Sequence, residues 1–381
     1  MAEPAILFTA FEPSGDRLAA PVIAALRAER PGVPVYGFGG PHMAAAGANL
    51  LQSTTDKAVM LGGAVSQVWN HCRRVRHLRG WLKEHPLGVF VPVDSPAANW
   101  AICKAVRDLQ PVAGIVHLAA PQLWAWAPWR IRKLRRLTDH VLCLLPFEPA
   151  WFDSRGVKAT FVGHPIFSEQ DAKSSATSDL PAARLKLALL PGSRHGEIKA
   201  NWPTMLAAFR QLQATHHELH GVVAAVDEPT ADWIRAAAWD GAAGVTIVCG
   251  QTDAVLRWAD AALVVSGTAT LQTAAVGTPF VTLFNVSRLK WHAVGRWLLR
   301  TRTFTLVNLI AEWRGLGRAV PEFVPHFGQV EPITAAVNNL LNDPAAHAAQ
   351  RERLSRVVEP YTGLNFAAGA AQHILAAGGW R

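Results

Sequence analysis

Short apolar runs alternate with segments of helical periodicity along the whole chain. The runs contain β-forming residues, and each is followed by apolar positions spaced three or four apart. They cover residues 5–10, 35–38, 88–93, 114–118 and 140–144, and then 186–190, 221–225, 245–249, 261–265 and 279–283. Strands buried on both faces of a parallel sheet have continuous apolar runs and are connected by helices. The pattern therefore predicts an α/β protein with doubly wound, parallel sheets.

A polar stretch divides the two series of runs. Residues 168–185 are rich in Ser, Ala, Asp and Lys and have no apolar periodicity, which is typical of a linker. We expect one Rossmann-like domain at 1–167, a second at 186–355, and a final helix within 356–381 that packs back on the first domain. Open sheets of this kind bind ligands beyond the carboxyl ends of their strands, so we expect the two domains to face a central cleft.

Composition excludes several classes of protein. The cysteines at 72, 103, 143 and 249 form no C-x-x-C pair, so we predict reduced core residues and neither a disulfide framework nor a zinc site. The chain starts without the pattern of a signal peptide, and no apolar run is long enough to span a bilayer, so we expect a cytoplasmic protein. The formal net charge of +9 is compatible with nucleic acid, anionic lipid or a phosphorylated small molecule as a partner.

One loop in the second half has the composition of a phosphate-binding turn. It follows an apolar run and contains Gly192, Ser193 and Arg194 ahead of a predicted helix. A guanidinium can bind phosphate oxygens with two hydrogen bonds, and the N–H groups at a helix start favour an anion. The alternative is a helix that is capped by Ser193 and leaves Arg194 in solvent.

A second loop of this kind follows residues 261–265 and also opens a helix. Its hydroxyls and backbone amides could hold a diphosphate, and Gln272, one turn into the helix, could reach ribose hydroxyls. The candidate diphosphate residues are Ser193, Arg194, Ser266, Gly267, Thr268 and Thr270. The alternative is capping, followed by a helix of small residues packed on the sheet. Because the chain has no Asp-x-Asp motif, we predict a site that works without a metal. No cofactor is expected.

Two strand ends in the first half carry carboxylates. Glu12 and Ser14 follow the first apolar run, and Asp94 follows the run at 88–93. Parallel α/β sheets collect catalytic groups at these ends, so we predict Asp94 as a general base and expect Glu12 to face the cleft. The alternative for Asp94 is an N-cap. Asp16 is interpreted as structural, because an acidic residue is favourable in the first turn of a helix.

Read in order, a series of short motifs resembles the lipid-A-disaccharide synthases. In the first half these are EPSGD (12–16), GGPHM (39–43), VDSP (93–96), PQLWAW (121–126) and PFE (146–148). In the second half they are GHP (163–165), LPGSR (190–194), SGTATL (266–271), NLIA (308–311) and PE (321–322). Each motif is weak alone, but their shared order covers most of the chain.

The resemblance implies a GT-B fold and an inverting transfer. A 2,3-diacylglucosamine unit would pass from its UDP derivative to 2,3-diacylglucosamine 1-phosphate, giving lipid A disaccharide 1-phosphate and UDP. The first domain would hold the acceptor near the membrane and the second would bind the nucleotide sugar. By motif match, Asp94 and Glu12 are catalytic, Arg194 lies at the diphosphate, and the substrate-binding residues are Ser14, Asn308 and Glu322.

Some positions depart from the family pattern. Gln272 stands where the helix normally carries Glu, and Ala97-Ala98 replaces the usual Asp-Phe. The sequence therefore leaves three alternatives open: a GT-B relative with another nucleotide sugar or acceptor, a sugar-nucleotide epimerase of similar fold, and a paralogue that binds lipid or nucleotide without transferring sugar.

Two basic segments with apolar stripes predict contact with an anionic membrane surface. The first has apolar residues at 65, 68, 69, 72 and 75, among arginines at 73, 74, 76 and 79; the second covers 288–302. The alternative for each is a core-facing helix with a solvated basic face. We predict peripheral association with the inner leaflet of the inner membrane. Nucleic acid is not expected because no binding motif accompanies the charge, and a homodimer is left open.

Overall fold

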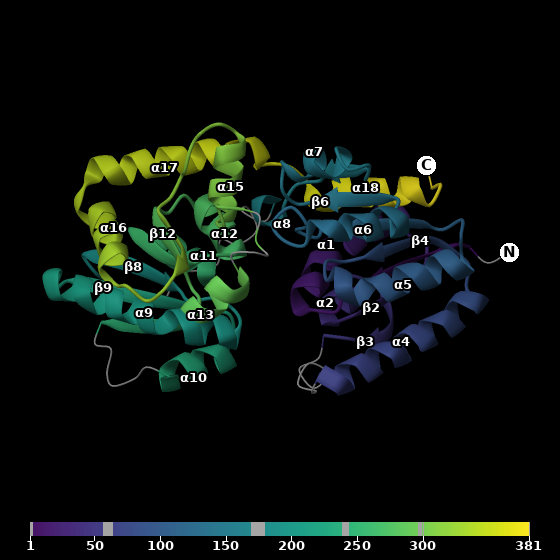
Figure 1. The fold of residues 1–381 in the computed structure, drawn as a ribbon, viewed down its shortest axis with the longest axis horizontal. Helices are drawn as coiled ribbons and strands as arrows, with labels where there is room; N and C mark the ends of the chain where they lie inside the picture. The colour runs from purple at the N-terminus through teal and green to yellow at the C-terminus, as the bar shows by residue number, and fades with distance from the viewer. Residues whose placement is uncertain are drawn as a thin grey trace. The chain divides into compact units, whose positions relative to one another are not determined.

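The protein forms two compact α/β units in a computed structural model (Figure 1). The residues described by the structure are 3–55, 64–168, 180–237, 244–295, 299 and 301–380. The first unit comprises Met1–Pro165 and Gly363–Arg381, and the second comprises Ile166–Thr362. The final segment, predicted to begin at residue 356, is thus divided between the units at Gly363. Most of the predicted linker lies outside the described residues.

The first unit contains a seven-stranded parallel sheet with the order β3-β2-β1-β4-β5-β6-β7. Its strands are β1 (Ala5–Thr9), β2 (Val35–Gly39), β3 (Asn49–Ser53), β4 (Leu87–Pro92), β5 (Gly114–Leu118), β6 (His140–Cys143) and β7 (Ala159–Phe161). Its helices are α1 (Pro13–Glu29), α2 (Pro41–Ala45), α4 (Ala64–Glu84), α5 (Pro96–Leu109), η1 (Pro128–Arg130), α6 (Ile131–Leu137), α7 (Glu148–Asp153) and α18 (Phe366–Ala377).

Two cores lie on opposite faces of this sheet. The side chains of α1 and α18 cover one face, because the buried positions of α1 recur at helical spacing and pack on Ile6 and Phe8. Helices α4, α5 and α6 cover the other face. Helix α18 comes from the end of the chain, yet it contacts α1, β4 and β5 (Figure 1). The first unit is therefore built from both ends of the sequence.

The second unit contains a six-stranded parallel sheet with the order β10-β9-β8-β11-β12-β13. Its strands are β8 (Leu185–Leu190), β9 (Leu219–Ala225), β10 (Val245–Cys249), β11 (Ala261–Val265), β12 (Phe280–Asn285) and β13 (Glu322–His326). Its helices are α8 (Pro165–Ser168) at the junction, α9 (His195–Thr215), α10 (Glu228–Ala237), α11 (Thr252–Trp258), α12 (Thr268–Val276), α13 (Arg288–Lys290), η2 (Trp291–Gly295), α15 (Leu306–Trp313), α16 (Glu331–Asn342), α17 (Pro344–Val358) and η3 (Glu359–Tyr361).

The predicted fold class is confirmed: every predicted apolar run is a strand, and both sheets are parallel. Strands β3, β7 and β13 were not predicted, and each lies at a sheet edge. The prediction that all four cysteines are core residues is wrong for Cys72, which is exposed on α4. Within the described part of the chain, no helix combines the length and apolarity needed to cross a membrane.

Candidate active site

The two predicted catalytic carboxylates belong to neighbouring strand ends of the first sheet. Glu12 lies between β1 and α1, Asp94 follows β4, and β1 pairs with β4. The Ser95 hydroxyl donates a hydrogen bond to Glu12 Oε1 at 3.3 Å. Both carboxylates are half-buried. Ser14 is exposed on the first turn of α1. The structure thus brings Glu12 together with the segment that carries Asp94.

The backbone at Asp94 and Ser95 is held in a conformation that side chains disfavour. Asp94 has φ +45° and Ser95 has φ +33°, both in the left-handed region. Such residues cost of order 1–3 kcal/mol each and persist only where surrounding structure imposes them. The N-cap of α5 is Ser95, without a side-chain capping bond, so the N-cap alternative for Asp94 is wrong. This strained turn places Asp94 just outside the helix.

A buried amide imposes this turn. Asn99 Nδ2 donates to the carbonyl oxygens of Val93, Asp94 and Ser95, at 3.4, 3.0 and 3.3 Å. Asn99 Oδ1 in turn accepts from the Thr9 hydroxyl at 2.6 Å. Neither residue was predicted from the sequence. Their signal was a polar residue at the end of an apolar strand and an amide on the buried face of a helix.

Two further titratable groups of the first unit are fully buried. His117 on β5 makes no side-chain hydrogen bond of normal geometry, and burial lowers its pKa to about 4, although the Asp94 backbone acts in the opposite direction. Glu148 accepts from Trp124 Nε1 at 3.0 Å and from the Leu145 N–H at 3.1 Å. Burial raises the pKa of Glu148 to about 7. The motifs around 121–126 and 146–148 therefore meet in one buried contact.

Asp16 is structural, as interpreted from the sequence. Its carboxylate accepts hydrogen bonds from the backbone N–H groups of Gly40, His42 and Met43, at 2.9–3.1 Å, and so closes the start of α2. A Cβ atom at Gly40 would lie 2.6 Å from Asp16 Oδ2, so only glycine fits there. Hydrogen bonds through Asp16 therefore join the motifs at 12–16 and 39–43.

The two candidate phosphate loops of the second unit follow neighbouring strands. β8 pairs with β11, and the residues after them are 191–194 and 266–268. Gly192 has φ +107° and packs beside Val265. Arg194, not Ser193, is the N-cap of α9, so the capping alternative for Ser193 is wrong. The exposed Arg194 guanidinium donates to Glu197 Oε1 at 2.9 Å.

Two hydroxyls of the loop after β11 shape the loop itself. Ser266 Oγ donates to the Phe304 carbonyl at 3.1 Å, and Thr270 Oγ1 donates to the Gly267 carbonyl at 2.7 Å. Thr268, the first residue of α12, is exposed. Thr270 is fully buried, so direct binding of a diphosphate by this hydroxyl does not fit the structure. The backbone of the loop and the exposed Thr268 are the groups that a ligand can reach.

Asn308 and Glu322 are hydrogen-bonded to each other, and their remaining polar atoms bind backbone groups. Asn308 donates to Glu322 Oε2 at 3.0 Å and to the Val320 carbonyl, and it accepts from the N–H groups of Ala319 and Val320. Glu322 also accepts from the N–H groups of residues 304 and 305. Asn308 is completely buried with its amide saturated, so its predicted contact with substrate does not fit the structure.

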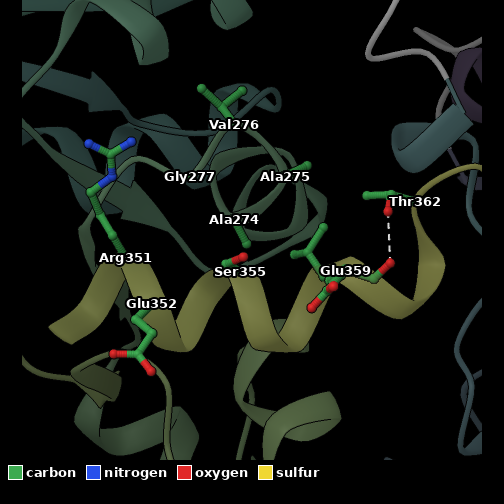
Figure 2. A pocket seen from close by; sticks show the side chains of 10 residues that line it. Ala274, Ala275, Val276, Gly277, Arg351, Glu352, Ser355, Glu359 and Thr362 are labelled. Carbon is green, nitrogen blue, oxygen red and sulfur yellow. Dashed lines mark hydrogen bonds between the residues drawn. The ribbon is translucent and has the colours of Figure 1, made fainter. Parts of the chain in front are cut away.

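A surface hollow of about 550 Å³ is present in the second unit (Figure 2). It is lined by the C-terminal end of α12 and by α17, including Arg351, Glu352 and Ser355. None of the predicted site residues lines it. The start of α12, where the candidate loop lies, is at the other end of that helix.

Comparison with known proteins defines the class. The S. aureus MnaA–UDP co-structure has a TM-score of 0.70 at 12% identity and covers 99% of this chain and 98% of that one. The glycosyltransferase of kitacinnamycin has a TM-score of 0.66 at 17% identity and covers 99% and 100%. At this identity the likeness concerns the fold alone. Two Rossmann-like units of this kind make the protein a GT-B protein.

Sequence comparison identifies the family. The family model described as lipid-A-disaccharide synthetase matches residues 6–365. The lipid-A-disaccharide synthase of Anaeromyxobacter sp. (strain K) is 35% identical over 92% of each chain. That of Ruegeria pomeroyi is 34% identical over 92% of this chain and 91% of its own. The chain belongs to the lipid-A-disaccharide synthase family and is a hexosyltransferase, which confirms the resemblance found in its motifs.

Proposed function

We propose that the protein transfers 2,3-diacylglucosamine from UDP-2,3-diacylglucosamine to 2,3-diacylglucosamine 1-phosphate. The products are lipid A disaccharide 1-phosphate and UDP. Family membership supports this reaction, and the observation that carries it is the arrangement at the ends of β1 and β4. There Asn99 bonds to the backbone of the turn that carries Asp94, and Ser95 in the same turn bonds to Glu12.

In the proposed mechanism Asp94 accepts the proton of the acceptor's 6-hydroxyl. The hydroxyl oxygen attacks the anomeric carbon from the face opposite UDP, the bond from that carbon to the diphosphate oxygen breaks, and the centre inverts. The negative charge that develops on the diphosphate is stabilised by Arg194 and by the backbone N–H groups at the start of α12. Loss of one preorganised donor of this kind costs on the order of a hundredfold in rate.

The first experiment is a direct assay. Purified protein is incubated in detergent with both acylated substrates, with and without a metal chelator, and the disaccharide 1-phosphate and UDP are followed by mass spectrometry. We expect both products under both conditions. We expect Asp94→Asn, which keeps the side-chain shape, to lower kcat by about 10² to 10⁴. No turnover, with an active family member alongside, would contradict the proposed reaction. Near wild-type turnover by Asp94→Asn would remove Asp94 as the base.

We also propose that α4 rests on the anionic inner leaflet. Trp69 is 65% exposed and Cys72 is exposed beside it, whereas Leu78 and Leu82 point into the core. Part of the predicted apolar stripe therefore faces solvent instead of the sheet. The Arg73 guanidinium lies 5.4 Å from the centre of the Trp69 ring. An indole next to exposed arginines suits a lipid headgroup region. The side chains at 65 and 68, and part of the second segment at 288–302, lie outside the described residues.

Vesicle sedimentation tests this surface. We expect binding to vesicles with phosphatidylglycerol, weaker binding to pure phosphatidylcholine, and loss of binding at high salt. Trp69→Ser should weaken binding severalfold, while Trp313→Ser, which removes an exposed indole of the second unit, should not. Equal binding by Trp69→Ser and wild-type protein would contradict the assignment to α4.

A further inference from the structure

Gln272 is hydrogen-bonded to a carboxylate from a neighbouring helix. Gln272 Nε2 donates to Asp253 Oδ1 at 2.6 Å. Gln272 lies in the second turn of α12, which follows β11, and Asp253 lies in the first turn of α11, which follows β10. Since all strands of this sheet are parallel, both helices begin at its carboxyl edge. The two helices contact each other, and both side chains are partly exposed.

This contact fixes the orientation of the amide. An ionised carboxylate can only accept hydrogen bonds, so Gln272 must turn its NH₂ group toward Asp253. Gln272 Oε1 and Asp253 Oδ2 receive no hydrogen bond from the described residues. The pair therefore offers two adjacent acceptors, one of them charged. Two neighbouring hydroxyl groups on one ligand would match it, because each hydroxyl can donate one hydrogen bond.

The pair also gives a physical reason for glutamine at position 272. A glutamate there would place a second carboxylate within hydrogen-bond distance of Asp253. Two carboxylates that share one site cannot both ionise without a large penalty. Gln272 removes that penalty and keeps one negative charge in the same place. The charge is carried by α11 instead of α12.

We propose that Asp253 and Gln272 together bind the vicinal ribose hydroxyls of the donor nucleotide. Asp253 thereby supplies the charge that the family pattern carries at position 272. This assignment rests on the proposed use of a UDP-activated donor. It makes Asp253, which no sequence motif marks, the residue that distinguishes a ribonucleotide from a deoxyribonucleotide.

Calorimetry with UDP and 2′-deoxy-UDP tests the assignment. A hydrogen bond to a charged group is worth roughly 1.5–3 kcal/mol, so we expect the wild-type protein to prefer UDP by about tenfold to a hundredfold. Asp253→Ala should lower the affinity for UDP and leave the two nucleotides within about threefold of each other. The matched control is Asp232→Asn, which changes an exposed carboxylate on α10 and should keep the wild-type preference.

Exchange of the two side chains gives a second, independent readout. We expect Gln272→Glu alone to weaken UDP binding about tenfold or more, because two carboxylates then compete for one place. The double variant Asp253→Asn with Gln272→Glu restores a single carboxylate paired with an amide, so the preference for UDP should return to within a few fold of wild type.

Three outcomes would overturn the assignment. An unchanged preference in Asp253→Ala, or tighter UDP binding by Gln272→Glu alone, would remove Asp253 from the ribose site while leaving the proposed transferase intact. Absence of UDP binding by the wild-type protein would overturn the proposed donor and this assignment together. The measurement of UDP binding by the wild-type protein therefore distinguishes a wrong donor nucleotide from a wrong role for Asp253.

Discussion

The Asn99 amide joins three consecutive carbonyls on one side to the Thr9 hydroxyl on the other. Its position in α5 is close to the turn it holds, so one side chain determines the backbone of the candidate base. Asn99 does not need to touch the substrate for this effect. We therefore interpret it as a positioning residue, and Thr9 as the residue that orients its amide.

Removal of the Thr9 hydroxyl tests this interpretation. Thr9→Val keeps the shape of the side chain but leaves Asn99 Oδ1 buried without its donor, which costs about 1–3 kcal/mol of folding free energy. We expect kcat to fall about tenfold or more with little change in KM, because the base moves while the binding loops stay in place. Thr9→Ser should retain most of the activity. An equal fall for both variants, or a change confined to KM, would contradict the positioning role.

Acid should destabilise the protein through His117. Its pKa is about 4 in the folded state and 6.5 ordinarily, so between these values the unfolded chain binds a proton that the folded chain does not. Folding free energy is then lost at about 1.4 kcal/mol per pH unit as the pH falls from 6.5 to 4, and the loss levels off below 4. Above pH 6.5 the histidine is neutral in both states and contributes no slope.

Urea unfolding of His117→Leu at several pH values measures this contribution. Between pH 6.5 and 4, we expect the unfolding of His117→Leu to take up about one proton fewer than that of the wild type. The unfolding free energy should therefore fall less steeply with decreasing pH, with similar stability at pH 7. His164 and His140 also have pKa values lowered to about 4 by burial, so part of the slope should remain. An unchanged slope would mean that His117 takes up a proton without unfolding.

The apolar runs were sufficient to predict the central strands of each sheet but not the edge strands. β3 has half-buried and exposed positions, β7 has three residues, and β13 contains a glutamate and a proline. An edge strand is covered on fewer sides, so its sequence needs less apolar character. The segments between the strands were predicted as helical connections, and this also follows from parallel pairing.

The candidate site could be predicted only where chemistry follows a strand end directly. Asp94, Glu12 and Arg194 are of this kind. Asp253 and Asn99 are not, because their importance comes from contacts with residues 19 and 90 positions away along the chain. Asn308 and Glu322 were found by motif, but no pattern in the sequence indicates that they bind each other. A motif identifies a residue that matters without saying whether a ligand or the fold requires it.

Variants of Asn308 separate those two possibilities. Asn308→Ala removes a saturated amide, takes away one of the donors to Glu322, and leaves the N–H groups of Ala319 and Val320 without their partner. We expect a loss of roughly 3–5 kcal/mol in folding free energy, measured by urea unfolding. The control Asn339→Ala, at an exposed position of α16, should change little. Unchanged stability together with weaker substrate binding would instead support the contact implied by the motif.

Helix α18, near the end of the sequence, is part of the hydrophobic core of the first unit. Phe366, Ala370 and Ile374 of α18 are completely buried against the first sheet and α1. Burial of a large apolar side chain contributes about 1.5–3 kcal/mol. The first unit therefore depends on the end of the chain for a substantial part of its stability.

Truncation after Thr362 tests this dependence. We expect the first unit to lose its cooperative unfolding transition while the second unit, whose core lacks α18, keeps its own. A synthetic peptide of residues 363–381 should restore the first transition. Within the full chain, Ile374→Ala should cost about 2–5 kcal/mol, whereas Gln372→Ala, exposed on the same helix, should be nearly neutral. Cooperative unfolding of the first unit in the truncated chain, without peptide, would contradict this view.

The position of α18 in the sequence also determines when the first unit can complete its core during synthesis. Domains usually fold from the N-terminus as they are synthesised. Here the strands of the sheet that carries Asp94 emerge before the second unit, but the sheet lacks α18 until Phe366–Ala377 have been synthesised. The first unit is therefore completed only after the second unit. We expect a message cut short within the second unit to yield a chain whose first sheet lacks α18 and exposes the apolar surface that this helix covers.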